Sequence, residues 1–351
     1  MKDASRVVHA GLPAPVQGEP FLPGPVLASP FHLIGEPGDA PYGYNRDDNP
    51  TWRRYEAALG ELEGAEAVLF ASGMAAVSAG VLGLGPGDVL VAPADGYPGI
   101  RALAEDHLAR NGVDVRLVPT DETAIRDALA GATLVWIETP SNPALDVIDI
   151  AALATDAHAA GAQLAVDNTV ATALGQRPLD LGADLVMTSC SKALTGHSDI
   201  NLGVITTRDA ARAEALRTWR SHSGAIAGPF EAWLAHRSLA TLDVRLERSC
   251  ANARAVAELL GARDDVDDVR YPGVGPLVCF TLRDAARAQA FLAASTLVLE
   301  ATSFGGVHTT AERRARWGTD AVPEGFIRFS AGIEATEDLL ADVAGALDTT
   351  A

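Results

Sequence analysis

Lys192 lies in a turn between two strand-like runs, a position where the edge of a sheet opens into a cleft. The run before it, 184–188, is short and apolar, and the run after it, 202–207, is β-branched and apolar at its centre. Two serines, Ser189 and Ser191, precede the lysine, and an amine beside small hydroxyl groups suits imine formation next to a bound phosphate. A solvated surface lysine is the alternative interpretation of this stretch alone, since lone lysines are usually exposed.

Polar residues follow three further strand-like runs. Gly73 lies in a turn at the start of a helix, where free backbone amides and the positive end of the helix dipole can hold a phosphate. Asn142 lies in a loop made rigid by two prolines and offers a donor, or the loop is only a structural turn. Asp167 directly follows a strand, where a carboxylate either caps a helix or pairs with the protonated nitrogen of a pyridine ring and keeps that ring an electron sink.

The elements that must position these residues alternate along the chain. Apolar, strand-like runs at 68–71, 88–91, 113–117, 134–137 and 163–166 are separated by helical stretches such as 100–110 and 123–129. Continuous apolar strands divided by helices indicate a mainly parallel sheet that is covered on both faces. Ligands collect at the carboxyl ends of the strands in such sheets, so the polar residues above should share one edge.

The two ends of the chain have a different character from this middle part. Residues 1–48 are rich in proline and glycine and show no sustained period, so we expect an extended arm that lies on another surface. A helix should begin at Asn49, and residues 49–230 should form the large domain. From Pro229 a long helical pattern leads to a smaller α+β domain, which we place at 231–351. Its expected strands are 277–282, 297–299 and 327–330, and its expected helices are 285–293 and 336–347.

Composition restricts the classes of partner. The 351 residues are 48% hydrophobic, enough for a large buried core, and 27 basic against 46 acidic residues give a net charge of −19. That charge opposes binding to nucleic acid or to an anionic membrane, so we interpret the arginines around Trp317 as a local helix or pocket rim. Neither a signal core nor a membrane-spanning run is present, and we expect a cytoplasmic protein. Three scattered cysteines (Cys190, Cys250, Cys279) predict packing residues, with neither disulfides nor a metal site.

Taken together, several segments resemble the Cys/Met-metabolism family of pyridoxal phosphate enzymes, over nearly the whole chain. The segments that carry the resemblance are Tyr44–Trp52, Ser72–Ala76, Tyr97–Ile100, Glu138–Pro143, Asp167–Thr169, Ser189–Asp199 and Phe326–Glu334. The resemblance implies the fold-type I α/β architecture, a mainly parallel sheet in a large domain plus a smaller C-terminal α+β domain, and pyridoxal 5'-phosphate as the cofactor.

The resemblance also implies roles for individual residues. The expected catalytic residues are Lys192 as the Schiff-base lysine, Tyr97 stacked on the cofactor ring, and Asp167 paired with the ring nitrogen. These three, with Tyr44, Arg46, Gly73, Met74, Thr169, Ser189 and Ser191, are the expected cofactor-binding residues. Arg328 is expected to clamp the carboxylate of a small-molecule amino-acid substrate, with Asn142 and Ser303 beside it.

Assembly follows from the same resemblance. The family uses the residues matching Tyr44 and Arg46 to reach the cofactor phosphate of a neighbouring subunit, which implies a homo-oligomer, specifically a dimer of dimers. His197 and Asp199, close after the lysine, are interpreted as loop anchors because the lysine itself can transfer protons.

Departures from the family concern the substrate pocket. Residues 311–318 replace a Pro-Ala-x-Met-Thr-His loop of the family, and a histidine-containing insertion after Val274 is omitted. Thr302 stands where cystathionine lyases carry a glutamate, and Gly99 stands where methionine lyases carry a cysteine. A distal ammonium group still needs a polar partner, and the candidates are Glu300 and, at the pocket rim, Asp47 or Glu312.

The expected activity is that of a carbon–sulfur lyase for sulfur amino acids, most similar to cystathionine γ-lyase, with cystathionine preferred over methionine. The alternatives are a cystathionine γ-synthase or O-acylhomoserine sulfhydrylase, a methionine γ-lyase, and, from another class, a cofactor-binding scaffold without turnover. A scaffold does not need the complete set of Tyr97, Asp167, Lys192 and Arg328.

Overall fold

A seven-stranded sheet forms the centre of the chain in the computed structural model, which describes residues 1–350. Its strands are β1 (Glu66–Phe70), β2 (Val89–Pro93), β3 (Asp114–Val118), β4 (Leu134–Glu138), β5 (Gln163–Asp167), β6 (Leu185–Ser189) and β7 (Gly203–Thr207), in the spatial order β1-β7-β6-β5-β4-β2-β3. Strands β2 to β6 pair in parallel, whereas β7 is antiparallel to both of its neighbours, β6 and β1. The expected mainly parallel sheet is confirmed, and each predicted strand is present within two residues of its expected ends.

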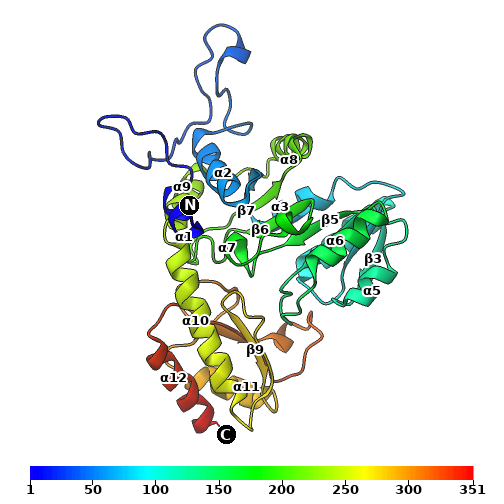
Figure 1. Ribbon diagram of the computed structural model, residues 1–351, viewed down its shortest axis with the longest axis vertical. Coiled ribbons are helices and arrows are strands. Elements are labelled where there is room, and N and C mark those ends of the chain that lie inside the picture. The colour runs from blue at the N-terminus through cyan, green and yellow to red at the C-terminus, as the bar shows by residue number, and fades with distance from the viewer. Residues whose placement is uncertain (351) are drawn as a thin grey trace.

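Helices cover both faces of this sheet (Figure 1). Neighbouring strand residues pack on opposite sides. Trp136 of β4 packs in the core with α3 (Gly73–Val81) and α8 (Ala210–Ser223), whereas Val135 packs with α5 (Glu122–Asp127) and α6 (Ile150–Ala159). The helix expected at 100–110 is instead a short α4 (Pro98–Leu103), which continues as a π-helical turn and a 3₁₀ turn to Asn111.

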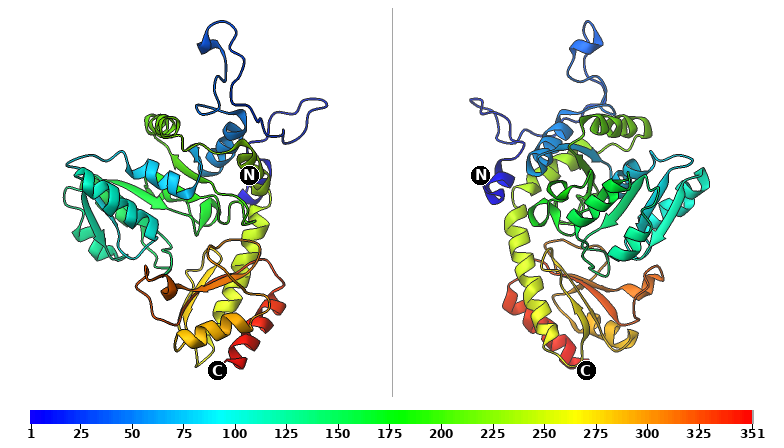
Figure 2. Two further views of the ribbon diagram at one scale, coloured as in Figure 1. Left: turned by 180° about the vertical axis from the view of Figure 1, so that it is seen from behind. Right: turned by 45° about the vertical axis from the view of Figure 1, so that its right-hand side comes forward.

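The N-terminal arm is irregular, as expected, apart from a short helix α1 (Asp3–His9) that the sequence did not predict and a 3₁₀ turn at Pro37–Asp39. Its loops project away from the rest of the chain (Figures 1 and 2). The arm ends at Asn49, whose side chain accepts a hydrogen bond of 2.8 Å from the amide of Thr51 and caps α2 (Pro50–Glu63). The predicted start of this helix is therefore confirmed.

Two helices, α9 (Pro229–Leu239) and α10 (Leu242–Gly261), lead to a second, five-stranded sheet. Its strands are β8 (Asp267–Arg270), β9 (Leu277–Thr281), β10 (Leu299–Glu300), β11 (Thr310–Arg313) and β12 (Phe326–Ser330), in the order β10-β11-β12-β9-β8, and its helices are α11 (Ala285–Ala294) and α12 (Thr336–Thr349). The strand expected at 297–299 is only the two-residue β10. Strands β8 and β11 were not predicted, because their charged residues hide the apolar alternation of a strand.

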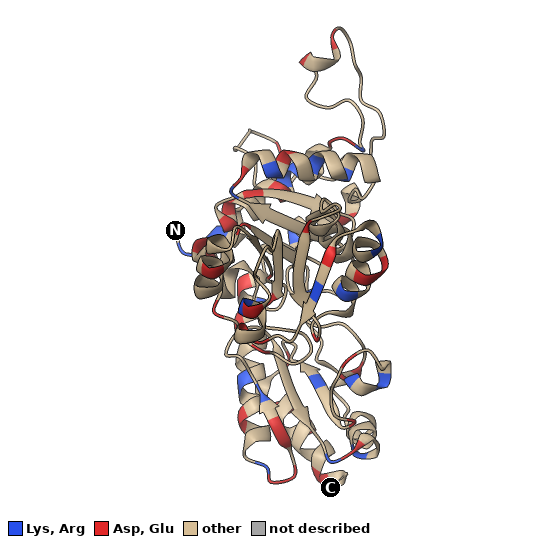
Figure 3. Ribbon diagram, turned by 90° about the vertical axis from the view of Figure 1, so that its right-hand side faces the viewer, with Lys and Arg blue, Asp and Glu red and all other residues tan. Residues whose placement is uncertain are grey.

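Charged residues of both signs are spread over the helices and loops around the strands (Figure 3). Two cysteines, Cys190 and Cys279, pack in apolar clusters, as the sequence predicted for them. Within residues 1–350, none of the helices combines the length and the apolar character that crossing a membrane requires.

Candidate active site

A cavity of about 590 Å³ lies at the carboxyl ends of the parallel strands, between the two sheets. It is lined by residues that the sequence assigned to a cofactor or a substrate: Gly73, Met74, Tyr97, Asn142, Asp167, Thr169, Ser189, Ser191, Lys192, Ser303 and Arg328. The structure thus brings together all the predicted site residues except the two in the arm. Their chemical roles stay predictions that the geometry below supports to different degrees.

Lys192 lies in the turn that joins β6 to β7. Its Nζ donates a hydrogen bond of 2.6 Å to Ser303 Oγ and lies 5.1 Å from the centre of the Phe304 ring. Burial, aided by the positive charge of Arg328, lowers the pKa of the Lys192 amine to about 8. A substantial share of the amine is therefore neutral near physiological pH, as a nucleophile or proton acceptor requires.

The start of helix α3 forms one end of the cavity. Ser72 caps this helix by accepting a 3.1 Å hydrogen bond from the amide of Ala75, and the amides of Gly73 and Met74 precede the first bond of the helix. A Cβ atom at Gly73 would lie 2.9 Å from Ser189 Oγ, so only glycine leaves the hydroxyl and the amides side by side. This arrangement suits an anion such as a phosphate.

The other hydroxyl groups near this end are already engaged. The Ser191 hydroxyl donates to the Leu202 carbonyl at 3.2 Å and accepts from the Leu202 amide at 3.0 Å, which ties the lysine turn to β7. The Thr169 hydroxyl donates to Asp167 Oδ1 and accepts from the amide of Ser189. Of the predicted phosphate ligands with hydroxyl groups, Ser189 is therefore the best placed.

Asp167 ends β5, next to Glu138 at the end of β4. Its Oδ1 accepts hydrogen bonds from the amide and hydroxyl of Thr169, at 3.0 and 2.5 Å. Burial raises the pKa of the Asp167 carboxyl to about 6, although the Thr169 bonds lower it, so the group is largely ionised at neutral pH. A fixed, buried carboxylate can hold the proton of a heterocyclic ring nitrogen.

Glu138 positions Tyr97. Its Oε2 accepts a hydrogen bond of 3.1 Å from the amide of Tyr97, whose side chain lines the cavity beside Met74. A Cβ atom at Gly99 would lie 2.4 Å from Met74 Sδ and 2.5 Å from Tyr97 Cε1. The cysteine that related methionine lyases carry at this place therefore does not fit here unless Tyr97 or Met74 moves.

Arg328 of β12 is buried at the opposite end of the cavity. Its guanidinium donates to Asn142 Oδ1 at 2.6 Å, to the Ser303 carbonyl at 3.0 Å and to Glu312 Oε1 at 2.5 Å. Ser303 itself has a φ of 78°, a conformation that is rare outside glycine and marks a constrained position at a site. These contacts use both hydrogen atoms of Nη2 and one of Nη1, and they fix a planar cation that can donate to a carboxylate through its other hydrogen atoms.

Tyr44 and Arg46 lie outside the cavity. Arg46 donates to the carbonyl and the hydroxyl of Ser221 on α8, at 2.9 and 3.4 Å, and its guanidinium lies 5.6 Å from the Tyr44 ring centre. Within one chain these residues make no part of the site, so their role toward a neighbouring subunit remains a prediction.

Of the three carboxylates expected to bind a distal ammonium group, Glu300 and Glu312 lie away from the cavity, which corrects the prediction for them, whereas Asp47 lies on the arm. Asp47 pairs with Arg46 on the arm, and Glu300 pairs with Arg316 at 2.7 Å. Glu312 was expected at the pocket rim but is completely buried among arginines. All three are engaged in ion pairs, and none of them lines the cavity.

The cavity also contains residues to which the sequence assigned no individual role, Phe304 and Arg314 among them. Phe304 packs under two cations, with its ring centre 5.1 Å from Lys192 Nζ and 5.4 Å from Arg328 Cζ. Arg314 lies at the outer wall in ion pairs with Glu312 and Asp320, at 2.7 and 2.6 Å. The placement of Phe304 directly after Ser303 was the available signal, whereas nothing in the sequence gave the contacts of Arg314.

These groups together fit pyridoxal 5'-phosphate. The amides of Gly73 and Met74 with the Ser189 hydroxyl suit its phosphate, the Asp167 carboxylate suits its ring nitrogen, and the Lys192 amine suits its aldehyde.

Comparison with known proteins agrees with this fit. The sequence profile described as "Cys/Met metabolism PLP-dependent enzyme" matches residues 28–348. A Streptomyces coelicolor protein provisionally named cystathionine gamma-lyase is 53% identical, with 99% of this chain and 94% of that protein covered. The cystathionine gamma-synthase of Mycobacterium tuberculosis is 37% identical over 98% of this chain and 96% of its own. Among solved structures, apo CalE6 from Micromonospora echinospora, a methionine gamma lyase, superposes with a TM-score of 0.93 at 36% identity and covers 99% of both chains.

Proposed function

Because the chain belongs to the Cys/Met metabolism family of enzymes that depend on pyridoxal 5'-phosphate, we propose that it is a carbon–sulfur lyase for sulfur amino acids. The proposed reaction is that of a cystathionine γ-lyase, which cleaves cystathionine to cysteine, 2-oxobutanoate and ammonia. The observation that carries the proposal is the single cavity in which the Lys192 amine, the Asp167 carboxylate, the Tyr97 ring and the Arg328 guanidinium meet. The name of the Streptomyces coelicolor relative supports the choice of substrate.

The bound cofactor supplies an electron sink for the negative charge that develops at the substrate Cα. The chain holds it at both ends: the amides of Gly73 and Met74 and the Ser189 hydroxyl bind the phosphate, and Asp167 keeps the ring nitrogen protonated. The ion-pair attraction between Asp167 and this nitrogen is strong because the carboxylate is buried.

Arg328 orients the substrate. Its guanidinium binds the α-carboxylate and so fixes the direction of the Cα–H bond relative to Lys192 Nζ. Lys192 then takes the Cα proton, which its lowered pKa permits near pH 8, passes it on, and takes a second proton from Cβ, so that the bond between Cγ and sulfur can break. Tyr97, at the cavity wall, donates a proton to the departing sulfur.

A cystathionine γ-synthase is the second candidate, and two observations favour keeping it. The Mycobacterium tuberculosis relative carries that name at 37% identity, and Thr302 brings a hydroxyl rather than a carboxylate to the cavity wall. The same residues would perform the same proton transfers on an acylated homoserine, with a thiol added in place of water at the end. A sulfhydrylase or a methionine γ-lyase would likewise use these transfers, whereas a cofactor-binding scaffold without turnover would not need the complete set of Tyr97, Asp167, Lys192 and Arg328.

A panel of substrates tests the proposal. Purified enzyme is given cystathionine, methionine, homocysteine, cysteine and O-acylhomoserines, and the 2-oxo acid and thiol products are measured with the Lys192→Ala variant as control. We expect 2-oxobutanoate and cysteine from cystathionine at the highest kcat/KM. A higher kcat/KM for methionine, or consumption of an acylated homoserine only when a thiol is present, would reject the γ-lyase assignment.

Assembly is part of the proposal. The arm exposes large apolar side chains, with Phe21 and Ile34 each 92% exposed, and such a surface favours burial against a second copy of the chain. We propose that Tyr44 and Arg46 then reach the phosphate of the neighbouring subunit, and that the enzyme is a dimer of dimers.

A further inference from the structure

Glu312 of β11 lies directly opposite Arg328 of β12 in the antiparallel pairing of the second sheet. Residues at opposed positions of two strands point to the same face, so the carboxylate and the guanidinium meet. We propose that Glu312 is a positioning residue that sets the orientation in which Arg328 receives the substrate carboxylate. This inference rests on the proposed function of Arg328.

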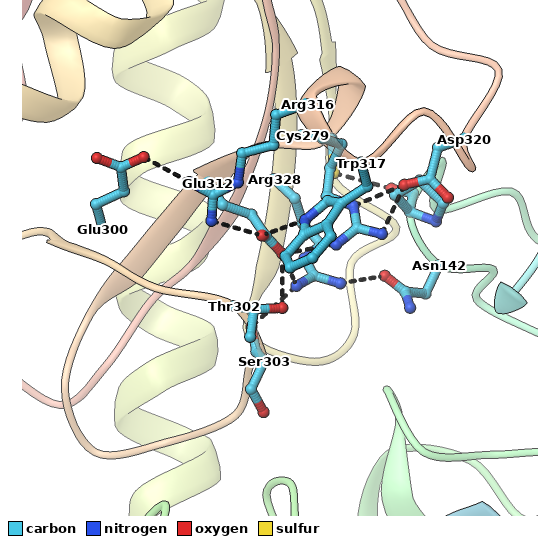
Figure 4. Close-up of polar contacts among 12 residues, drawn as sticks. Asn142, Cys279, Glu300, Thr302, Ser303, Glu312, Arg316, Trp317, Asp320 and Arg328 are labelled. Carbon is cyan, nitrogen blue, oxygen red and sulfur yellow. Dashed lines mark hydrogen bonds and ion pairs between the residues drawn. The ribbon is translucent and has the colours of Figure 1, made fainter. Parts of the chain in front are cut away.

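The Glu312 carboxylate is held from several sides (Figure 4). Its Oε1 accepts hydrogen bonds from Thr302 Oγ1 at 3.2 Å, from Arg314 at 2.7 Å and from Arg328 at 2.5 Å. Its Oε2 accepts from Trp317 Nε1 at 2.9 Å and from Arg316 at 3.3 Å. A carboxylate has about four lone-pair sites, so these five donors saturate it and leave it no freedom to rotate.

The neighbours of Glu312 are anchored in turn. Arg314 also binds Asp320 at 2.8 Å through Nε, and Arg316 also binds Glu300 at 2.7 Å. The other contacts of Glu312 therefore fix the position of its carboxylate, and the Arg328 side chain takes its orientation from that carboxylate.

Arg328 has three acceptors, of which only one carries a full charge. Asn142 Oδ1 and the Ser303 carbonyl are neutral, whereas Glu312 is a buried anion. Burial acts to raise the pKa of Glu312, but the positive charges of Arg328 and Arg314 and the Trp317 hydrogen bond outweigh it and keep the pKa below its usual value. The ionised carboxylate thus supplies the strongest of the bonds that fix the guanidinium plane.

Ligand binding separates this role from general structural support. L-Norleucine has the length of methionine but carries no sulfur to be eliminated, and n-pentylamine is the same molecule without the carboxylate. The Kd of each is read from the absorbance change of the bound cofactor during titration of the holoenzyme, which requires no turnover. Four variants are compared with the wild type: Glu312→Gln, Glu312→Asp, Arg328→Lys and Glu300→Gln.

We expect Glu312→Gln to weaken norleucine binding by about tenfold or more, the value of one buried charged hydrogen bond, while the Kd of pentylamine changes less than about threefold. Glu312→Asp keeps the charge but moves it away from Arg328 by the length of one methylene group. This variant should weaken norleucine binding to a similar degree. The matched control Glu300→Gln removes a charge one step away from Glu312 but keeps a side-chain oxygen that can accept from Arg316, so the Kd of both ligands should stay unchanged.

Other outcomes overturn the inference. Equal weakening of both ligands would mean that Glu312 only supports the fold, and normal norleucine binding by Glu312→Asp would mean that it only neutralises charge. If Glu312→Gln does not retain the cofactor, Glu312→Asp decides the question. If Arg328→Lys fails to distinguish the two ligands, the assignment of Arg328 is itself wrong, a result separate from the failure of the Glu312 variants.

Discussion

The amine of Lys192 should react at a far lower pH than an ordinary lysine. Its pKa is lowered from 10.5 to about 8, first by burial and second by the positive charge of Arg328. At pH 7 a group with a pKa of 8 is about 10% neutral, compared with about 0.03% for a pKa of 10.5, so its reactivity should be roughly 300-fold higher than without the shift.

Trace acetylation of cofactor-free protein over pH 6 to 11 measures this directly. Lys2 and Lys192 are the only lysines in the sequence, and the exposed Lys2 provides the internal reference in the same mass spectrum. We expect the labelling of Lys192, normalised to that reference, to rise through a midpoint near pH 8. A Lys192 midpoint near the ordinary value of 10.5 would refute the argument that burial and Arg328 make this amine a proton acceptor at neutral pH.

Three further predictions concern the cofactor site, stability and assembly. A Cβ atom at Gly203 would lie 2.4 Å from the carbonyl oxygen of Ser72, so Gly203→Ala should displace the phosphate-binding turn and raise the Kd of the cofactor at least about tenfold; an unchanged Kd in equilibrium dialysis would contradict this. Burial raises the pKa of Glu63 to about 7 from 4.5, so the wild type loses stability as the pH rises from 4.5 through 7. Urea unfolding of Glu63→Gln should therefore show a gain of up to about 3 kcal/mol at pH 8 and almost none at pH 4, and equal effects at both values would exclude this cause. Mixed refolding of inactive Lys192→Ala and Arg46→Ala chains should restore activity in hybrid dimers, whereas hybrids that form without activity would show that the arm serves its own subunit.

Much of the large sheet and its site could be predicted because short-range patterns encode them. The β-strands around Lys192 are apolar over their whole length, and buried parallel strands give this signal without any knowledge of their partners. Gly73, Asp167 and Lys192 each follow such a strand closely, so knowing the strand ends was enough to expect them at one edge.

The second sheet was harder to predict because its strands carry charged residues, instead of an apolar pattern, where the sheet borders the cavity. Glu312 and Arg314 are buried, but their sequence is that of a solvated segment, and their burial depends on ion pairs between chain segments that only the strand register reveals. For the same reason Glu312 was expected at the pocket rim, and its contact with Arg328, sixteen residues later in the chain, was not foreseen. The position of the arm relative to α8 likewise depends on a long-range contact, between Arg46 and Ser221.

The position of β1 in the sheet also determines when the chain can first hold its cofactor during synthesis. Its partner is β7, with Glu66 opposite Thr207, so β1 leaves the ribosome roughly 140 residues (207 minus 66) before the strand it pairs with. At typical elongation rates this interval is on the order of ten seconds. The phosphate-binding turn at the end of β1 packs against Gly203 of β7, and this contact is missing until that strand docks. The first strand of the nascent chain therefore stays unpaired during this interval. The cofactor can bind only after the lysine turn and β7 have both been synthesised.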